Sequence, residues 1–362
     1  MRYENLETVK LNNCAVTLGK FDGLHAGHMQ LINAITKVSK NVADPAYRLT
    51  SVVINLIKEG EDRFILSSDE KHGVLEAAGV DVCIDVVMTK EFMACDAREF
   101  LENVLVDKLG VRYLAVGYDF CYGKERMGNI DFLKENQEKY GYKLYVATKE
   151  SRYGKRVSST SIKEMLEAGE MGMATRCLGR PFEVEGEVVH GNHLGRTLDM
   201  PTANIVWPSD KVMVAKGVYL SKVELEGFEY FGITNVGTKP TVDWIYGLNV
   251  ETNIFDFNED IYGKKMKVTL LKHLRPEMKF SDVEALKEQM HKDRSEGKSI
   301  IQQSLNVEGL PFIVTKNSKE ALREQAVAML MLDLKRAEER AEIEGWIDAD
   351  DLGRELGVKP RK

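Results

Sequence analysis

The 362-residue chain has only five cysteines, no Cys-x-x-Cys pair and no long apolar run. An odd number of scattered cysteines is typical of free thiols in a reducing compartment and argues against a disulfide scaffold. No run approaches the roughly 20 apolar residues that span a bilayer. The charged first ten residues lack the apolar core of a signal peptide. These absences predict a soluble cytoplasmic protein without a membrane partner.

Basic charge is also in deficit, since Lys and Arg total 50 against 57 for Asp and Glu, a formal net charge of −7. Broad nucleic-acid binding depends on a basic surface, so we expect no nucleic-acid partner. Small anionic ligands are not excluded, because backbone amides and a few cations can hold them. The balance of 43% hydrophobic and 30% charged residues is typical of globular proteins, and the length suits two domains.

Strand-like and helix-like patterns alternate through the first half of the chain. Apolar residues recur at helical spacing between short apolar runs, and this β-α-β-α rhythm predicts a parallel sheet covered by helices. The expected strands are 14–18, 49–56, 82–87, 113–117 and 143–147, and the expected helices are 31–42, 70–78, 100–109 and 132–140.

The rhythm changes near Gly179-Arg180-Pro181, and short β-rich runs follow without helices between them. This pattern predicts an antiparallel barrel or sandwich, closed by a helix from Val283 to about Lys292. We therefore expect domains at 1–181 and 182–294. The expected strands of the second domain are 182–189, 218–225, 230–236, 250–257 and 266–274.

The last stretch, 295–362, predicts a helical extension. Asn317 and Glu320 have the spacing of a capping box, and a helix of about 25 residues with one apolar face follows. Such a helix either packs on its own barrel or offers an interaction arm to a protein partner. The segment has no His or Cys, so we expect no catalytic role for it and expect truncation after Asp293 to leave the activity of the two domains intact.

The strongest local signal is the run from Gly19 to His28, between a predicted strand and a predicted helix. Glycines there permit phosphate oxygens to approach backbone amides, and a helix N-terminus favours negative charge. His25 and His28 are three residues apart and can project from the same side of the first helical turn. Two alternatives are a glycine turn with surface histidines and a zinc site, for which no third or fourth ligand is evident.

This run resembles the first motif of the adenylyltransferase domain of prokaryotic bifunctional riboflavin kinase/FAD synthetases. Val116–Gly123 and Val157–Lys163 resemble two further motifs of that domain, in the same order. The resemblance implies that His25 and His28 contact ATP phosphates in catalysis and that Asp119 contacts flavin. Without the resemblance, Ser158 and Ser159 would be interpreted as the N-cap of a helix. The ATP-binding residues that the resemblance implies are Gly19, Phe21, Asp22, Gly23, Gly27, Ser158, Ser159, Thr160 and Lys163.

Two departures from the family pattern occur in this domain. Members usually carry Thr-Phe-x-Pro-His-Pro after the second strand, whereas Val53–Lys58 contains neither proline nor histidine. Lys163 stands where the family has arginine, which removes a planar bidentate phosphate contact.

The run from Gly195 to Asn204 resembles the kinase-domain signature that ends Pro-Thr-Ala-Asn, and later segments match as far as residue 293. The resemblance implies that Gly195 and Arg196 bind ATP, that Thr202 and Asn204 bind ATP and Mg²⁺, that Glu251 is the general base, and that Arg275 contacts flavin. Hydroxyl and amide oxygens are hard ligands suited to Mg²⁺. Without the resemblance, Pro201–Asn204 would be interpreted as a turn and Glu251 as a solvated strand residue. Asp199 departs from the pattern, where the family usually has glycine.

The resemblance implies an N-terminal doubly wound, Rossmann-like nucleotidylyltransferase domain and a C-terminal antiparallel riboflavin-kinase β-barrel. It also implies phosphorylation of riboflavin to FMN and adenylylation of FMN to FAD, with Mg²⁺ as cofactor and ATP as co-substrate. Riboflavin, FMN, FAD and ATP are then the partners. One alternative is a riboflavin kinase whose adenylyltransferase domain is degenerate, and another is a non-catalytic flavin- or nucleotide-binding regulator.

Overall fold

The computed structural model describes residues 1–40, 47–61, 63–149, 151–152, 155–191, 200–238 and 248–308. Two compact units divide these residues. The first contains Met1–Ile162 and Cys177–Gly179, and the second contains Lys163–Arg176 and the described residues from Arg180 to Glu308. Lys163–Arg176 belongs to the second unit although it precedes residue 181 in the sequence. The domain boundary at residue 181 stays a prediction.

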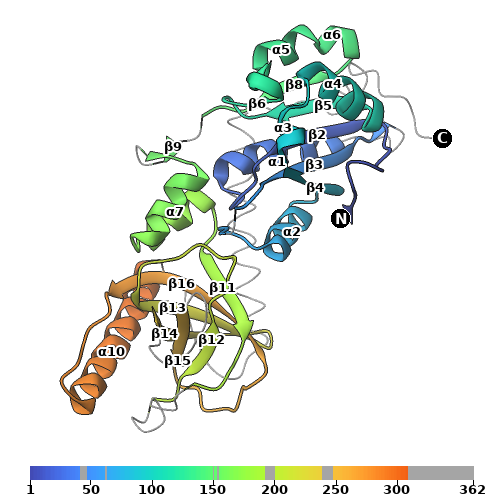
Figure 1. Ribbon diagram of the computed structural model, residues 1–362. Coiled ribbons are helices and arrows are strands. Elements are labelled where there is room, and N and C mark those ends of the chain that lie inside the picture. The colour runs from blue at the N-terminus through green and yellow to red at the C-terminus, as the bar shows by residue number, and fades with distance from the viewer. Residues whose placement is uncertain are drawn as a thin grey trace. The chain divides into compact units, whose positions relative to one another are not determined.

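The first unit is built on a six-stranded sheet in the order β1-β4-β3-β2-β5-β8, in which every neighbouring pair is parallel (Figure 1). The predicted parallel sheet is confirmed. Only β1 was missed, because two residues carry no periodicity. The strands are β1 (Arg2–Tyr3), β2 (Cys14–Gly19), β3 (Thr50–Lys58), β4 (Val82–Met88), β5 (Val111–Val116) and β8 (Lys143–Val146).

The position of β2 defines where this sheet can bind a ligand. β2 pairs with β3 on one side and with β5 on the other, so the chain builds outward in one direction and then returns to the opposite side. The carboxyl ends of β2 and β5 therefore meet at a topological switch point, where open α/β sheets bind their ligands.

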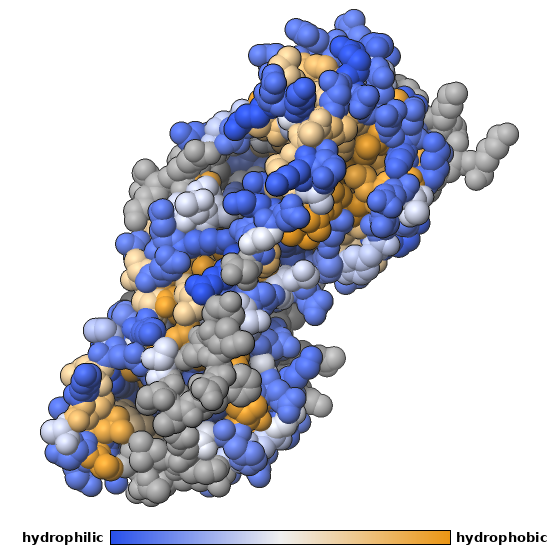
Figure 2. All heavy atoms as spheres, in the orientation of Figure 1, coloured by the Kyte–Doolittle hydropathy of each residue, from blue (hydrophilic) through white to orange (hydrophobic). Residues whose placement is uncertain are grey.

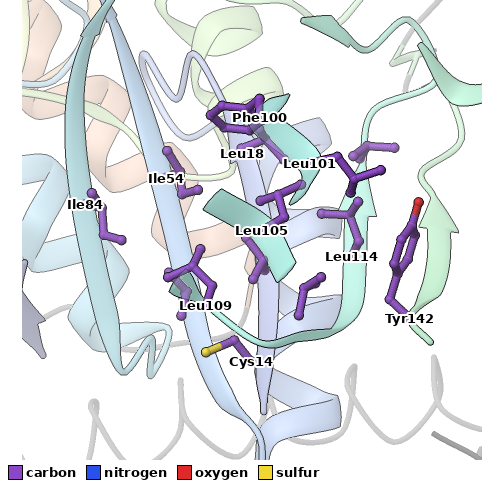
Figure 3. Close-up of a cluster of buried hydrophobic side chains, with 14 of the residues drawn as sticks. Cys14, Leu18, Ile54, Ile84, Phe100, Leu101, Leu105, Leu109, Leu114 and Tyr142 are labelled. Carbon is purple, nitrogen blue, oxygen red and sulfur yellow. The ribbon is translucent and has the colours of Figure 1, made fainter. Parts of the chain in front are cut away.

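Helices cover both faces of this sheet, because successive strand residues point to opposite faces. Cys14, Val16 and Leu18 pack with η2 and α5, whereas Ala15 packs with α1 and α2 (Figure 3 shows the first of these clusters). The main covering helices are α1 (Ala26–Lys40), α2 (Ser68–Ala77), the π-helix η2 (Phe100–Lys108), α5 (Ile130–Glu135) and α6 (Gln137–Tyr140). The predicted helix 132–140 is thus two helices that break at Asn136.

The remaining elements before the barrel are short. They are α3 (Lys90–Met93), α4 (Ala97–Glu99), β6 (Cys121–Tyr122), η3 (Lys124–Arg126), β7 (Gly128–Asn129), β9 (Ser151–Arg152), β10 (Lys155–Arg156), α7 (Ser159–Glu167) and α8 (Met171–Leu178).

The second unit contains an antiparallel six-stranded sheet in the order β11-β16-β13-β14-β15-β12. Val189, just beyond β11, bridges to Asn204 in β12, so the two edges meet and the sheet is a nearly closed barrel. The predicted barrel is confirmed. Its strands are β11 (Phe182–Glu187), β12 (Ala203–Val206), β13 (Gly217–Leu225), β14 (Phe228–Thr238), β15 (Leu248–Ile254) and β16 (Lys265–Arg275).

Helix α10 (Val283–Glu308) packs on this barrel and continues past the end predicted near Lys292. Ile300 and Ile301 contact a cluster formed by Val218, Leu220, Ile233 and Phe255. The helix end predicted near Lys292 is therefore wrong. That both activities survive truncation after Asp293 stays a prediction. The extension helix predicted after Asn317 lies outside the described residues.

Hydrophilic side chains dominate the face of the molecule that Figure 2 shows, with hydrophobic side chains gathered in smaller patches. Within the described ranges, no helix combines the length and the apolar character that a membrane crossing requires.

Candidate active sites

The loop after β2 lies at the switch point of the parallel sheet, and its backbone has little freedom. Gly23 has a φ of +81°, and a Cβ at this position would lie 2.9 Å from the Cδ1 atom of Ile65. Leu24, fully buried, also has a positive φ of 43°. A bulky residue in this region of backbone conformation is strained, and such strain is concentrated at functional sites.

His25 and His28 form a stacked pair at the start of α1. Their ring centroids are 3.6 Å apart with an interplanar angle of 18°. The Nδ1 atom of His25 accepts a hydrogen bond of 3.3 Å from the backbone N–H of His28. Phe21 packs against His28 edge to face, with the ring centroids 5.1 Å apart. The pair is thus held beside the helix N-terminus, where backbone amides favour an anion.

Asp22 holds this loop to two other segments. Its Oδ1 atom accepts a 2.8 Å hydrogen bond from the backbone N–H of Ile65. Its carbonyl oxygen accepts a 2.7 Å hydrogen bond from the hydroxyl of Ser159, so two residues of the predicted ATP site meet. The carboxylate side chain of Asp22 faces the protein, and these contacts give it a loop-positioning role.

The serine motif begins α7, as the N-cap interpretation predicted. The Oγ atom of Ser158 accepts a hydrogen bond of 3.2 Å from the backbone N–H of Ser161, three residues on. Thr160 is exposed, and Lys163 is half-buried one turn further along the helix. The N-cap is therefore confirmed. The nucleotide contact predicted for Ser158, Ser159, Thr160 and Lys163 stays a prediction.

Asp119 is exposed and follows the end of β5, on the other side of the switch point from the histidine loop. Gly19 ends β2, and Gly27 lies in the first turn of α1. In this unit, the residues predicted from the motifs therefore follow the carboxyl ends of β2 and β5 or begin α1 and α7.

Three residues that the motifs did not identify form a polar chain beside this loop. The Nζ atom of Lys71 in α2 donates to Oδ1 of Asn55 over 3.4 Å, and Nδ2 of Asn55 donates to Oδ1 of Asp85 over 2.6 Å. Lys71 and Asn55 are only 5% and 1% exposed. Burial lowers the pKa of the Lys71 ammonium, although the Asp22 and Asp85 carboxylates partly offset this effect. The only sequence signal was that Lys71 lies four residues before the buried Leu75, on the same helix face.

The alternative zinc reading of His25 and His28 gains no support. In the described part of the chain, the one group of three potential metal ligands is His72, Cys83 and Asp85. Burial raises the pKa of the Cys83 thiol to about 12, so this residue is protonated at neutral pH.

The second site lies where β12 and β15 pair. Asn204 is directly opposite Glu251 in this register. Just before β12, the Thr202 hydroxyl donates a 2.7 Å hydrogen bond to Oε1 of Glu251. Asn204 is 3% exposed, and its Oδ1 atom accepts a 2.9 Å hydrogen bond from Nδ2 of Asn249. The structure therefore brings together Thr202, Asn204 and Glu251, which the sequence separates by about 50 residues.

Thr202 and Glu251 line a cavity of about 190 Å³ between the barrel strands and α10. Its wall is mainly apolar, as suits the ring system of an aromatic ligand. The apolar lining residues are Met200, Val218, Ile233, Met278, Phe280, Leu286 and Met290.

Arg275 also lines this cavity, but its guanidinium is held by the protein. Its Nε and Nη2 atoms donate to the two carboxylate oxygens of Asp293, over 2.9 and 2.7 Å. Gln289 donates to the same carboxylate over 2.8 Å. This bidentate pair joins the end of β16 to α10, so Arg275 builds the wall of the cavity. Gly195, Arg196 and Asp199 lie outside the described residues.

Comparison with known proteins relates each unit to a family. Residues 7–161 match a family model described as FAD synthetase, and residues 178–301 match one described as riboflavin kinase. Three relatives are each described as a bifunctional riboflavin kinase/FMN adenylyltransferase. The protein of Pseudomonas fluorescens is 33% identical over 77% of this chain and 90% of its own length. The protein of Haemophilus influenzae is 34% identical over 78% and 92%, and that of Escherichia coli (strain K12) is 32% identical over 80% and 93%.

A solved structure has the same fold over most of both chains. It is described as a macrolide-efflux protein from Streptococcus pneumoniae and aligns with a TM-score of 0.72 and 27% identity, covering 82% of this chain and 98% of that one.

Proposed function

The chain belongs to the bifunctional riboflavin kinase/FMN adenylyltransferase family, and on this premise we propose how its residues divide the two reactions. The protein is a transferase of FAD biosynthesis that uses ATP as co-substrate. In our proposal, residues 182–294 phosphorylate riboflavin and residues 1–181 adenylylate FMN, and both reactions take place in the cytoplasm.

Glu251 is the general base of the kinase. It accepts the proton of the ribityl 5′-hydroxyl as that oxygen bonds to the γ-phosphorus of ATP and the bond to the β-phosphate oxygen breaks. The hydrogen bond from Thr202 supports this role, because it fixes the carboxylate at a cavity of about 190 Å³ whose apolar wall suits an aromatic ring system. This carboxylate is the observation that carries the proposal.

Thr202 and Asn204 fit a magnesium site, because their hydroxyl and amide oxygens are hard ligands beside a carboxylate. The amide oxygen of Asn204 accepts a hydrogen bond from Asn249, which helps to orient the amide group. When bound, Mg²⁺ neutralises phosphate charge. Thr202 also orients Glu251, and both residues bind and align the reacting groups.

The adenylyl transfer needs no general base, because the FMN phosphate is already ionised. Its oxygen bonds to the α-phosphorus of ATP, and the bond to the β-phosphate oxygen breaks, so that pyrophosphate leaves with the electron pair. His25 and His28 contact the ATP phosphates and stabilise the developing charge. Ser158, Ser159, Thr160 and Lys163 help to hold the nucleotide, Asp119 contacts the flavin, and alignment supplies most of the remaining rate.

Two variants made in the same chain test this division of roles. Glu251→Gln keeps an acceptor for Thr202 but loses the base, so FMN formation should fall by about 10²–10⁴-fold while supplied FMN is still converted to FAD. Replacing both His25 and His28 with alanine should abolish FAD formation while FMN accumulates. Each variant is the folding control for the other. A defect in both reactions from either variant would contradict two separate sites, and near-normal FMN formation by Glu251→Gln would remove this residue from the mechanism.

A further inference from the structure

We propose that Lys71 is an additional phosphate-binding residue of the adenylyl-transfer site, where its ammonium contacts the ATP polyphosphate and the leaving pyrophosphate. The inference rests on the proposed function of that site. It begins from a buried cation that neither the motifs nor the comparisons assign.

The ammonium of Lys71 is buried but incompletely bonded. Lys71 is 5% exposed, and among the described residues the single hydrogen-bond partner of its Nζ atom is the amide oxygen of Asn55, at 3.4 Å. Nζ also lies 5.8 Å from the centroid of the Phe64 ring. An ammonium has three donors, so donors are left for another group. A buried charge without a counter-ion in contact is costly, and residues that keep one usually bind an anion or a metal. A lysine cannot bind a cationic metal while protonated, so an anion is the matching ligand.

The position of Asn55 locates this cation at the phosphate loop. In the parallel sheet, Asn55 of β3 pairs in register with Gly19, the last residue of β2, after which the histidine loop begins. The carboxylate of Asp22 within that loop interacts electrostatically with Lys71 and favours its charged form. The cation therefore lies beside the loop that carries His25 and His28, at the edge of the sheet where ligands bind.

A purely structural role explains these contacts less well. Asn55 already bonds to Asp85 over 2.6 Å, and Asp85 bonds to His72 over 3.0 Å, so the polar chain is held together without Lys71. No ion pair within the described residues includes the Lys71 ammonium, although nearby carboxylates favour its charged form. During the transfer, negative charge grows on the leaving pyrophosphate, and a poorly hydrated ammonium stabilises that charge strongly.

The direct test compares the variants Lys71→Met and Lys71→Arg with wild type. Lys37→Met is the control, because Lys37 is exposed on α1 in the same unit. We expect Lys71→Met to lower kcat/KM for ATP in FAD formation by about ten- to hundredfold, the range of a lost hydrogen bond to a charged group. The arginine variant should recover part of this loss. FMN formation from riboflavin in the same samples should be unchanged, because that reaction takes place in the other unit. The ligand-free Tm reports the folding of the unit that carries Lys71.

The pH dependence separates a charge from a shape effect. Phosphate binding needs the protonated amine, and burial lowers the pKa of Lys71 in the free protein. The carboxylates of Asp22, Asp85 and Glu61 and the Cys83 side chain oppose this shift without cancelling it. The value of kcat/KM for FAD formation should therefore fall as the pH rises through this lowered pKa, below the range near 10.4 in which an exposed lysine loses its proton. Arginine stays protonated, so the alkaline fall should move to higher pH in Lys71→Arg.

Thermal melting with and without pyrophosphate covers the case in which the proposed function itself fails. Pyrophosphate should raise the Tm of wild-type and Lys37→Met protein but not that of Lys71→Met, whose ligand-free Tm should equal or exceed that of wild type because a buried charge is gone. A wild-type protein that makes no FAD but shows this pattern would refute adenylylation and keep the phosphate contact.

Three results would overturn the inference. The first is a Lys71→Met variant with wild-type kcat/KM for ATP and a normal pyrophosphate shift. The second is a lower ligand-free Tm with an unchanged pyrophosphate shift, which indicates a structural lysine. The third is a defect confined to the KM for FMN, which would assign the contact to the flavin phosphate.

Discussion

At the scale of single residues, Gly23 shows how closely the phosphate loop is fitted to its surroundings. Its φ of +81° is unfavourable for any L-residue with a side chain, and a Cβ would lie 2.9 Å from Ile65. We expect Gly23→Ala to cost about 1–3 kcal/mol of local strain and to displace the neighbouring His25. FAD formation should drop at least tenfold, whereas FMN formation stays normal.

The measurement is product chromatography after parallel incubations of wild type, Gly23→Ala and Gly60→Ala. Gly60 is the matched control, because it also has a positive φ, +75°, but a Cβ there meets nothing within 4 Å. Equal FAD formation by the two glycine variants would show that strain in the histidine loop has no bearing on adenylylation.

Residue patterns predicted the parts of each site that are local in sequence and missed those that depend on packing. The spacing of His25 and His28 already placed both rings on one helical turn, and the structure has them stacked. Lys71 belongs to no sequence motif. It comes close to the histidine loop only through the packing of α2, in which its ammonium bonds to Asn55 of β3. The pairing of Arg275 with Asp293 could not be predicted, because it depends on where α10 lies. The flavin contact predicted for Arg275 stays a prediction.

At the scale of elements, strands were predicted where apolar runs are framed by turns. β12 was missed as a strand, because its four residues follow Pro201 and read locally as a turn; pairing with β15 makes it a strand. α10 was also predicted too short, because local sequence does not show what the helix packs against. Gly297 looks like a helix stop, yet a Cβ there would lie 2.7 Å from Ile233, so the glycine allows α10 to approach the barrel closely.

Truncation tests the corrected length of α10. A chain ending at Glu308 should keep both activities within about threefold, a change of under 1 kcal/mol in barrier height. A chain ending at Asp293 loses Ile300 and Ile301 from the cluster under the helix. Both are partly buried, so each loss should cost less than the about 2–5 kcal/mol of a fully buried isoleucine. We expect its barrel to unfold at lower temperature and its FMN formation to fall, while supplied FMN is still converted to FAD.

Calorimetry and product assays of the two truncated chains check this expectation. If the chain ending at Asp293 melts and phosphorylates like the longer one, then α10 beyond Asp293 does not support the cavity, and the shorter helix predicted from sequence would describe the working domain better.

At the scale of the whole molecule, the change from alternating β and α patterns to β runs alone predicted two architectures in one chain. Hydrophobic periodicity carries this information, because a parallel sheet needs crossover helices and an antiparallel barrel does not. The ordered motifs predicted two chemistries, and the two family models match the two halves separately. What periodicity could not predict is which side chains from distant strands meet, such as Thr202 with Glu251.

The central claim is that one chain carries out both steps, with the base Glu251 in the barrel and the histidine loop in the parallel-sheet unit. The most direct measurement is a time course of pure wild-type protein with riboflavin, ATP and Mg²⁺, with FMN and FAD separated by chromatography. The account predicts that FMN appears first and that FAD follows as FMN is consumed. FMN that accumulates without FAD, even when FMN is supplied directly, would contradict it and leave a kinase with a degenerate adenylyltransferase domain.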